Sequence, residues 1–354
     1  LKYVKLMLLP PGYNKFFGRF RGFAEKKLVY KDWMAALARI EAEEPQYPVS
    51  DGACALGGAV DLNGEAGNEI VQAGLAALNN MPHRVGETYD DNGNIIAADG
   101  AGALIGYVHD QLADLLLTER DRKRLGDPKR LQVGMFNFRR DDPEAVVARL
   151  KDEVAACFTR YGLRPLGWTR LETNESEIVP ARLPQMRRHE MLAFATDGVD
   201  RNADVQNVFK VGRRINGELG DVRIDSLALD RIVFKGLLTP KELVKYFPIL
   251  QQMMALYIII HGRYATNELG ANPQPFGSSA ANGEVNSIGG NRMRLTDLGM
   301  SVPFSHRVLT RGGSDSAHLN DAIDLMLVNG VPLHEAIIRL IPPALRKIFL
   351  TWLF

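Results

Sequence analysis

Segments with strand-like and helix-like patterns intermix along this chain without the strict alternation of a doubly wound parallel sheet. Apolar runs typical of strands cover residues 131–138, 163–171, 205–211, 232–234 and 256–260. Apolar residues at helical spacing mark residues 30–44, 69–78, 143–158, 315–327 and 334–340. This order of segments predicts an α+β layered sandwich rather than a parallel α/β fold.

Composition excludes several classes of function. The 354 residues include 43 Lys+Arg against 42 Asp+Glu, and this balance lacks the basic face that nucleic acid binding needs. The two cysteines, Cys54 and Cys157, are too few for a disulfide scaffold, a four-cysteine zinc site or a cysteine-bound iron–sulfur cluster. The seven histidines are dispersed and form no metal-binding pattern, so no metal site is predicted.

The chain carries no pattern typical of a membrane protein. Its longest apolar stretch, residues 253–260, is far shorter than the ~20 residues of a membrane-spanning helix. The short apolar run near the N-terminus is broken by Pro10 and Pro11 and followed by basic residues, which argues against a secretory signal. We therefore expect a cytoplasmic protein without a membrane partner.

Cys54 lies in a stretch of small residues directly before an apolar strand. A thiol in that position would be accessible to a ligand, although an isolated cysteine is more often a small buried hydrophobic residue. Cys157 falls beside Val154 and Phe158 on the apolar side of a helix and is predicted to lie in the core.

Two polar segments follow the last apolar strand. Arg263 presents a planar fork that suits a carboxylate, with a surface turn as the alternative. Farther on, the side-chain amide of Asn282 and the backbone N–H of Gly283 provide two adjacent donors of the kind that stabilise an oxyanion. A plain Asn-Gly turn is the alternative there.

Ser314 and Asp315 open a helix after a glycine pair. Both residue types are good helix N-caps, so capping is the simple interpretation of this segment. No Gly-x-Ser-x-Gly elbow is present to indicate a serine hydrolase of the α/β-hydrolase kind.

Several short motifs occur in an order that resembles one known family. They are His261-x-Arg-Tyr-x-Thr-Asn, Gln274-Pro-Phe, Asn282-Gly-Glu-Val-Asn-Ser and Gly313-Ser-Asp-Ser-Ala, preceded by His83-Arg84, residues 99–103 and residues 232–243. Together they resemble the class II glutamine amidotransferase domain of the glutamate synthase large subunit. The resemblance covers residues 51–343, which is most of the chain.

This resemblance implies a four-layer αββα sandwich of the N-terminal-nucleophile type. Cys54 would be the nucleophile, and its own α-amine would be the general base. Because that nitrogen is an amide while Ala53 is attached, residues 1–53 would be a propeptide and residues 54–354 the amidotransferase domain. Asn282 and Gly283 would form the oxyanion hole.

The resemblance also implies the residues that bind L-glutamine. Arg263 would hold the α-carboxylate of the substrate and Asp315 its α-ammonium group. Arg84 and Thr266 match further substrate-binding positions of the family.

The implied activity is the glutaminase component of glutamate synthase, which hydrolyses L-glutamine to L-glutamate and ammonia for transfer to 2-oxoglutarate at a synthase site. FMN, an iron–sulfur cluster and NAD(P)H would belong to a synthase domain or partner subunit, with no cofactor on this chain. One alternative is an amidotransferase for another acceptor, such as N-methylglutamate synthesis. Another is a non-catalytic glutamine-binding module.

The chain departs from the family pattern at three places. Ala55 replaces the glycine after the nucleophile, and Ala281 replaces the histidine that usually precedes Asn-Gly-Glu. The last residues, 348–354, are unlike the family, which predicts that the C-terminal part of the domain is incomplete or completed by a partner.

Overall fold

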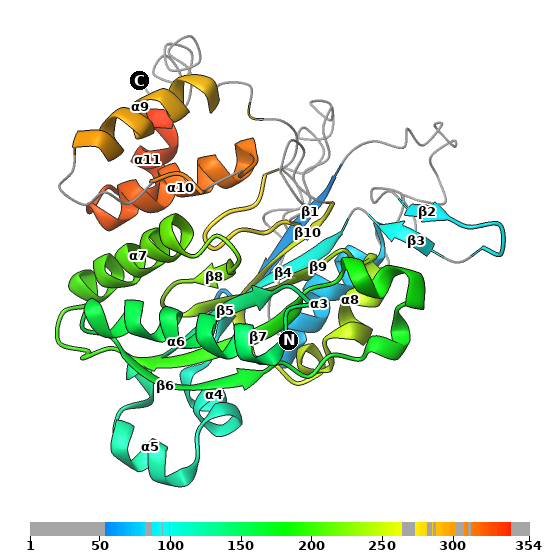
Figure 1. Ribbon diagram of the computed structural model, residues 1–354, viewed down its shortest axis with the longest axis horizontal. Helices are drawn as coiled ribbons and strands as arrows, with labels where there is room; N and C mark the ends of the chain where they lie inside the picture. The colour runs from blue at the N-terminus through cyan, green and yellow to red at the C-terminus, as the bar shows by residue number, and fades with distance from the viewer. Residues whose placement is uncertain are drawn as a thin grey trace.

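The computed structural model describes residues 54–81, 87–93, 95–98, 100–263, 273–281, 285, 288–301, 308–310 and 313–340. These residues form two four-stranded antiparallel sheets and their helices (Figure 1). The first sheet has the order β1 (Ala55–Val60), β10 (Ala255–Gly262), β4 (Ala101–Tyr107) and β9 (Arg231–Gly236). The second has the order β6 (Arg164–Arg170), β7 (Arg188–Ala195), β5 (Leu131–Phe138) and β8 (Arg223–Leu227). A short hairpin joins β2 (Glu87–Tyr89) to β3 (Ile95–Ala98).

Helices pack on both sheets. Against the first sheet lie α3 (Asn68–Asn79) and α8 (Pro240–Tyr246). Gly74 allows α3 to approach closely, because a Cβ atom there would lie 2.4 Å from a methyl carbon of Ile258. The second sheet is covered by α6 (Glu144–Arg160) and α7 (Arg201–Glu218) through a core rich in phenylalanine (Figure 1).

The remaining helices are shorter or lie toward the C-terminal part. Between β4 and β5 come α4 (His109–Leu116) and α5 (Glu119–Leu125). The 3₁₀ helices cover Pro128–Arg130, Glu175–Glu177, Pro180–Gln185 and Pro248–Gln251. Next to α7 lies a group of three helices, α9 (Ile288–Ser301), α10 (Asp315–Val328) and α11 (Leu333–Leu340) (Figure 1).

A buried ion pair joins this group to α7. The guanidinium of Arg213 lies 2.7 Å from a carboxylate oxygen of Asp321 on α10, and the same carboxylate accepts the backbone N–H of Thr310 at 2.6 Å. Both charged groups are largely shielded from water, so removing either one would leave the other buried without its partner.

The strand predicted for residues 205–211 is wrong, because this segment lies inside α7. Its valines suggested a strand, since β-branched residues favour strands. The buried positions Val208, Val211 and Ile215 are instead spaced by three and four, as one helix face requires. Asp200 begins the helix by accepting the backbone N–H of Asn202 at 2.8 Å.

The other expected elements within the described residues are confirmed to within about two residues. The mixed architecture agrees with the prediction of intermixed strands and helices. Cys157 lies in the core on α6, as expected, and burial raises the pKa of its thiol. The helix expected at 30–44 lies outside the described residues. Within the described part of the chain, no helix combines the length and apolar character needed to cross a bilayer.

Candidate active site

One end of the first sheet brings the candidate nucleophile and the candidate carboxylate-binding arginine together. The register pairs Ala55 of β1 with Gly262 of β10, and Gly262 with Ala101 of β4. Cys54 and Arg263 are the residues directly beyond the first of these pairs. Antiparallel pairing therefore places the start of β1 and the end of β10 side by side at this end of the sheet.

The two cysteines differ in their surroundings. Cys54 is a half-buried free thiol at the sheet end, whereas Cys157 is buried in the core of the second sheet. Only a thiol that a ligand can reach can attack a substrate. The structure therefore leaves Cys54, and not Cys157, in a position suited to chemistry.

Arg263 adopts a backbone conformation that side-chain-bearing residues rarely use. Its φ is 130°, which costs about 1–3 kcal/mol and persists only where the surroundings enforce it. Here its N–H donates to the carbonyl of Gly100 at 2.8 Å, and its carbonyl lies 3.2 Å from Nδ1 of His261. These contacts hold the backbone of Arg263 at the end of β10.

Asp315, the first residue of α10, does not cap its helix. Ser314 takes that role by accepting the backbone N–H of Ala317 at 3.1 Å, which confirms the capping interpretation for the serine. The buried carboxylate of Asp315 instead accepts the backbone N–H of Val285 at 2.6 Å and that of Ser316 at 2.6 Å. A carboxylate has about four lone-pair sites, so these contacts leave acceptor capacity for an ammonium group.

A loop over the first sheet, residues 273–281, connects these groups. The side-chain oxygen of Gln274 accepts the N–H of Ala281 at 2.7 Å, and its amide nitrogen lies 3.4 Å from Oγ of Ser316. Nε2 of His261 lies 3.1 Å from the carbonyl of Ala281. Through these hydrogen bonds the loop contacts both the end of β10 and the start of α10.

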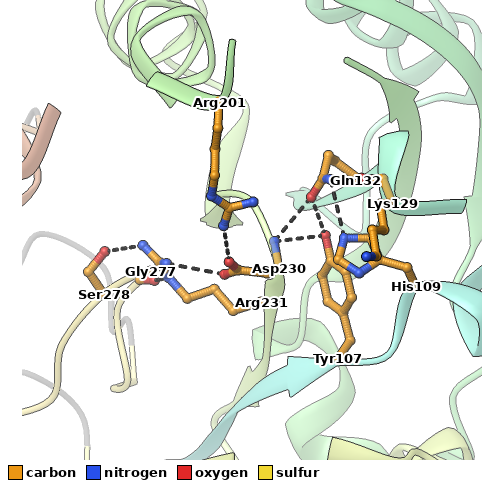
Figure 2. A network of polar contacts seen from close by, with 9 residues as sticks. All are labelled: Tyr107, His109, Lys129, Gln132, Arg201, Asp230, Arg231, Gly277 and Ser278. Carbon is orange, nitrogen blue, oxygen red and sulfur yellow. Dashed lines mark hydrogen bonds and ion pairs between the residues drawn. The ribbon is translucent and has the colours of Figure 1, made fainter. Parts of the chain in front are cut away.

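Other side chains fix the same loop from the sheet and from α10. Nζ of Lys235 donates to the carbonyl of Pro275 at 3.3 Å and lies 4.9 Å from the ring centre of Phe276. Arg231 donates to the carbonyl of Gly277 and, at 2.6 Å, to Oγ of Ser278 (Figure 2). The side-chain oxygen of Asn320 on α10 accepts the N–H of Ser278 and the hydroxyl of Ser279, both at 3.0 Å.

His261 is uncharged at neutral pH. It is fully buried, and burial together with the charge of Arg263 lowers its pKa to about 4. The two carbonyl oxygens beside its ring nitrogens raise the pKa but are outweighed, and the neutral ring, which has one N–H, donates to one of them. The imidazole therefore acts as a structural link rather than as a proton carrier near neutral pH.

A separate polar cavity lies between the sheets. Four of the residues that line it are buried polar or charged residues: Asn137, His189, Asp225 and Lys235. Nζ of Lys235 lies 3.7 Å from the Asp225 carboxylate. The cavity's residue Gly236 is in register with Ala101 at the sheet end that carries Cys54, although none of the predicted site residues that the structure describes lines the cavity.

The structure places three of the seven predicted site residues. Cys54 and Arg263 lie at the same end of the first sheet. Asp315 is connected to that end by its hydrogen bond to Val285 and by the hydrogen bonds of the loop 273–281. The other four lie outside the described residues: Arg84, Thr266, Asn282 and Gly283. Among the described residues, no group of three potential ligands is placed to hold a metal ion.

Sequence comparison decides the family. The family described as "Glutamine amidotransferases class-II" matches residues 54–349, which is most of the chain. The chain belongs to the class-II glutamine amidotransferases. The matched region begins at Cys54, and this family implies the N-terminal-nucleophile fold, in agreement with two antiparallel sheets flanked by helices.

Curated relatives of this amidotransferase are glutamate synthases. It is 28% identical over 345 residues to "Glutamate synthase [NADH]" of Schizosaccharomyces pombe, covering 88% of this chain and 16% of that protein. It is 28% identical over 341 residues to the chloroplastic ferredoxin-dependent glutamate synthase of Oryza sativa subsp. japonica, covering 87% and 20%. With "Glutamate synthase [NADPH] large chain" of Bacillus subtilis the identity is 26% over 318 residues, covering 82% and 20%.

These matches confirm the resemblance read from the motifs, as a distant homology over most of the chain. The amidotransferase spans a fifth or less of the length of these relatives.

Proposed function

We propose that this domain hydrolyses the side-chain amide of L-glutamine with Cys54 as the nucleophile. The main support is the position of Cys54, the first residue of the family match. It directly precedes β1 at the end of the sheet where Arg263 follows β10. Sγ attacks the amide carbon, ammonia leaves, and a γ-glutamyl thioester forms on Cys54. Water then attacks the thioester, which releases L-glutamate and restores the thiol.

The general base in this proposal is the α-amine of Cys54. An α-amine titrates near about 7.7–8.0 and a thiol near about 8.5, so the proton passes between them at little cost near neutral pH. The amine takes the thiol proton during attack and gives it to the leaving nitrogen. Because an amide nitrogen cannot accept this proton, the peptide bond between Ala53 and Cys54 must be cleaved first, with residues 1–53 as a propeptide.

The substrate is held at its amino acid end. Arg263 forms a bidentate pair with the α-carboxylate, and the buried carboxylate of Asp315 accepts the α-ammonium group. Arg84 and Thr266 complete the substrate contacts. Asn282 and Gly283 donate to the oxyanion that develops as the thiol attacks, and each such donor is worth about 10²–10³ in rate. The proposed architecture has four layers, αββα.

The whole activity that we propose is that of glutamate synthase, in which the ammonia aminates 2-oxoglutarate at a synthase site. The named relatives support this acceptor. The required FMN, iron–sulfur cluster and NAD(P)H are assigned to another domain or subunit. Cys157 is buried in the core and Cys54 is the nucleophile, so this chain cannot supply the cysteine ligands of a cluster. A cytoplasmic location stays a prediction.

The test is a full chain with a protease site placed directly before Cys54, chosen so that cleavage leaves Cys54 as the first residue. We expect glutamine hydrolysis to appear on cleavage, together with γ-glutamyl hydroxamate when hydroxylamine replaces water. Cys54→Ser, cleaved in the same way, is the matched control and should stay inactive. Full activity in the uncleaved chain would contradict the amine mechanism. Glutamine binding by calorimetry without hydrolysis in either form would indicate a non-catalytic module.

A second measurement identifies the acceptor. The active domain is combined with a synthase subunit, and ammonia transfer to 2-oxoglutarate is compared with transfer to other candidate acceptors. Stimulation of glutaminase by 2-oxoglutarate in that mixture supports glutamate synthesis. Coupling to another acceptor alone would favour a different amidotransferase, such as one for N-methylglutamate.

A further inference from the structure

The carboxylate of Asp315 accepts three hydrogen bonds from described residues, and its two oxygens share them unequally. Oδ2 accepts the backbone N–H of Val285 at 2.6 Å. Oδ1 accepts two bonds from Ser316, one from its backbone N–H at 2.6 Å and one from its hydroxyl at 3.1 Å. A carboxylate has about four lone-pair sites, which is about two on each oxygen. Ser316 therefore fills Oδ1, and a further donor has its place on Oδ2.

The direction of the Ser316 hydroxyl is set by a second partner. The side-chain amide nitrogen of Gln274 lies 3.4 Å from the same Oγ. An amide nitrogen only donates and a carboxylate only accepts, so Oγ accepts from Gln274 and gives its own hydrogen to Asp315. All three residues are buried, with exposed fractions of 3% for Gln274, 4% for Ser316 and 7% for Asp315. Hydrogen bonds in such a buried chain strengthen one another.

The other end of this chain of hydrogen bonds is fixed to the loop over the first sheet. Oε1 of Gln274 accepts the N–H of Ala281 at 2.7 Å. Because this contact turns the amide oxygen toward Ala281, the amide nitrogen faces Ser316. The loop is held in turn by Lys235 of β9, whose Nζ donates to a loop carbonyl at 3.3 Å. The orientation of the Asp315 carboxylate is thereby tied to the first sheet as well as to its own helix.

We propose that Ser316 is a positioning residue for the α-ammonium group of the substrate, an inference that rests on the proposed function. It acts through Asp315. By filling Oδ1, its hydroxyl leaves Oδ2 as the oxygen that receives the ammonium group. It also restrains rotation of the carboxylate, because rotation would break a directional hydrogen bond. A charged acceptor that is already held in one orientation loses less entropy when its partner binds.

The expected loss is confined to ligands that carry an α-ammonium group. L-Glutamate and glutarate share both carboxylates and differ in this group alone. Ser316→Ala should weaken the binding of L-glutamate about 3–10-fold, as expected for one lost hydrogen bond, and change that of glutarate less than about twofold. The KM for glutamine should rise about 3–10-fold as well, with kcat within about threefold of the unaltered value.

The experiment is calorimetry with L-glutamate and glutarate on the full chain cleaved before Cys54, with urea unfolding measured alongside. Ser226→Ala is the matched control, because Ser226 is also a buried serine whose hydroxyl accepts an N–H, that of Val233 at 3.0 Å. It lies on β8 in the second sheet. We expect both variants to lose stability and only Ser316→Ala to reduce the preference for L-glutamate over glutarate.

A double variant shows whether Ser316 acts through Asp315. In Asp315→Asn the negative charge is already absent, so adding Ser316→Ala should cause no further loss of the preference for L-glutamate. An additional loss in the double variant would contradict the proposed route. If Ser316→Ala does not fold, Gln274→Met replaces it, because this change removes the donor that orients the Ser316 hydroxyl, and the same selective weakening is expected.

The outcomes distinguish the two proposals. If the unaltered cleaved enzyme does not hydrolyse glutamine, the proposed function fails. If it hydrolyses glutamine and prefers L-glutamate over glutarate, but Ser316→Ala keeps that preference, only the positioning role is overturned. Equal weakening of both ligands in Ser316→Ala would also overturn it, because that result would indicate a general structural effect. A hydrolysing enzyme that binds both ligands equally would remove Asp315 from the ammonium contact, and the role of Ser316 with it.

Discussion

The two ends of the first sheet are each organised around a buried glutamine, yet they differ in what surrounds it. At the far end, Oε1 of Gln132 accepts the hydroxyl of Tyr107 at 2.8 Å and the N–H of Asp230 at 3.0 Å (Figure 2). At the site end, Gln274 accepts the N–H of Ala281 in the loop that contacts His261 of β10.

Each end also carries one of the two non-glycine residues with positive φ among those the structure describes. They are Asp230 at 67° and Arg263 at 130°. The carboxylate of Asp230 pairs with Arg201 and, at 3.6 Å, with Arg231, so a polar network joins strands and a helix at this end, and through Arg231 it reaches the loop at Gly277 and Ser278 (Figure 2). At the site end the residue with positive φ is Arg263, whose backbone is held by Gly100 and His261. The comparison shows that a residue with positive φ belongs to a structural polar network at one end of the sheet and to the candidate active site at the other.

The largest effect should come from the nucleophile. Cys54→Ala should lower glutamine hydrolysis by about 10³ or more, because no other group at the sheet end replaces the thiol. Cys157→Ala should retain the activity and lose about 1 kcal/mol of unfolding free energy, since only a small buried side chain is truncated. Steady-state rates and urea unfolding of both variants check this. A large loss of activity in Cys157→Ala alone would reverse the assignment.

The next effect concerns the substrate's ammonium group. Asp315→Asn keeps an oxygen that accepts the N–H of Val285 but removes the negative charge. We expect the KM for glutamine to rise about 10–100-fold, as the loss of a charge-assisted contact of about 1.5–3 kcal/mol implies, with a small change in kcat. Binding of glutarate, which lacks the ammonium group, should change little. Equal weakening of both ligands would place Asp315 outside the substrate contacts.

The site end should also respond to acid through His261. Burial depresses its folded pKa to about 4, below the unfolded value of about 6.5, so the unfolded chain binds this proton more readily. The associated stability is present above about pH 6.5 and is lost as the pH falls toward 4, by about 3 kcal/mol in total. Unfolding free energies of the unaltered chain and of His261→Gln between pH 7 and 4.5 test this. The variant should show a shallower decline, and parallel curves would refute the assignment to His261.

The smallest effect on function is expected at the far end. Gln132→Met removes the acceptor of the Tyr107 hydroxyl and one of the two acceptors of the Asp230 N–H, which keeps Tyr107 Oη at 3.2 Å; the change should cost about 1–3 kcal/mol of unfolding free energy. The kcat for glutamine should not change. Denaturant unfolding together with activity measurements checks this. A marked loss of activity would show that the two ends are coupled through the sheet.

Much of the fold follows from local pattern. The apolar run of β5, which ends in two phenylalanines, and the serine that caps α10 are both visible in the residues themselves. Residues 205–211 were predicted wrongly, because four closely spaced apolar residues fit a strand and one face of α7 equally well. Burial of Val208, Val211 and Ile215 against the second sheet decided between them.

The site was predictable in part. The motifs indicated Cys54, Arg263 and Asp315, and the structure places the first two at one sheet edge. The contacts of Gln274 and His261 with Ala281 were not predictable, because a backbone group of alanine carries no signal in the residue type. The roles of Arg84, Thr266, Asn282 and Gly283 stay predictions.

Because Cys54 lies immediately before a paired strand, its position is fixed by the strand that follows it. The six residues of β1 are paired in register with β10. The proposed cleavage before Cys54 would therefore create a charged N-terminus that has one residue between it and a fixed strand. Adding one residue between Cys54 and Ala55 would move the sulfur by about 3.3 Å and turn it to the opposite face of the sheet.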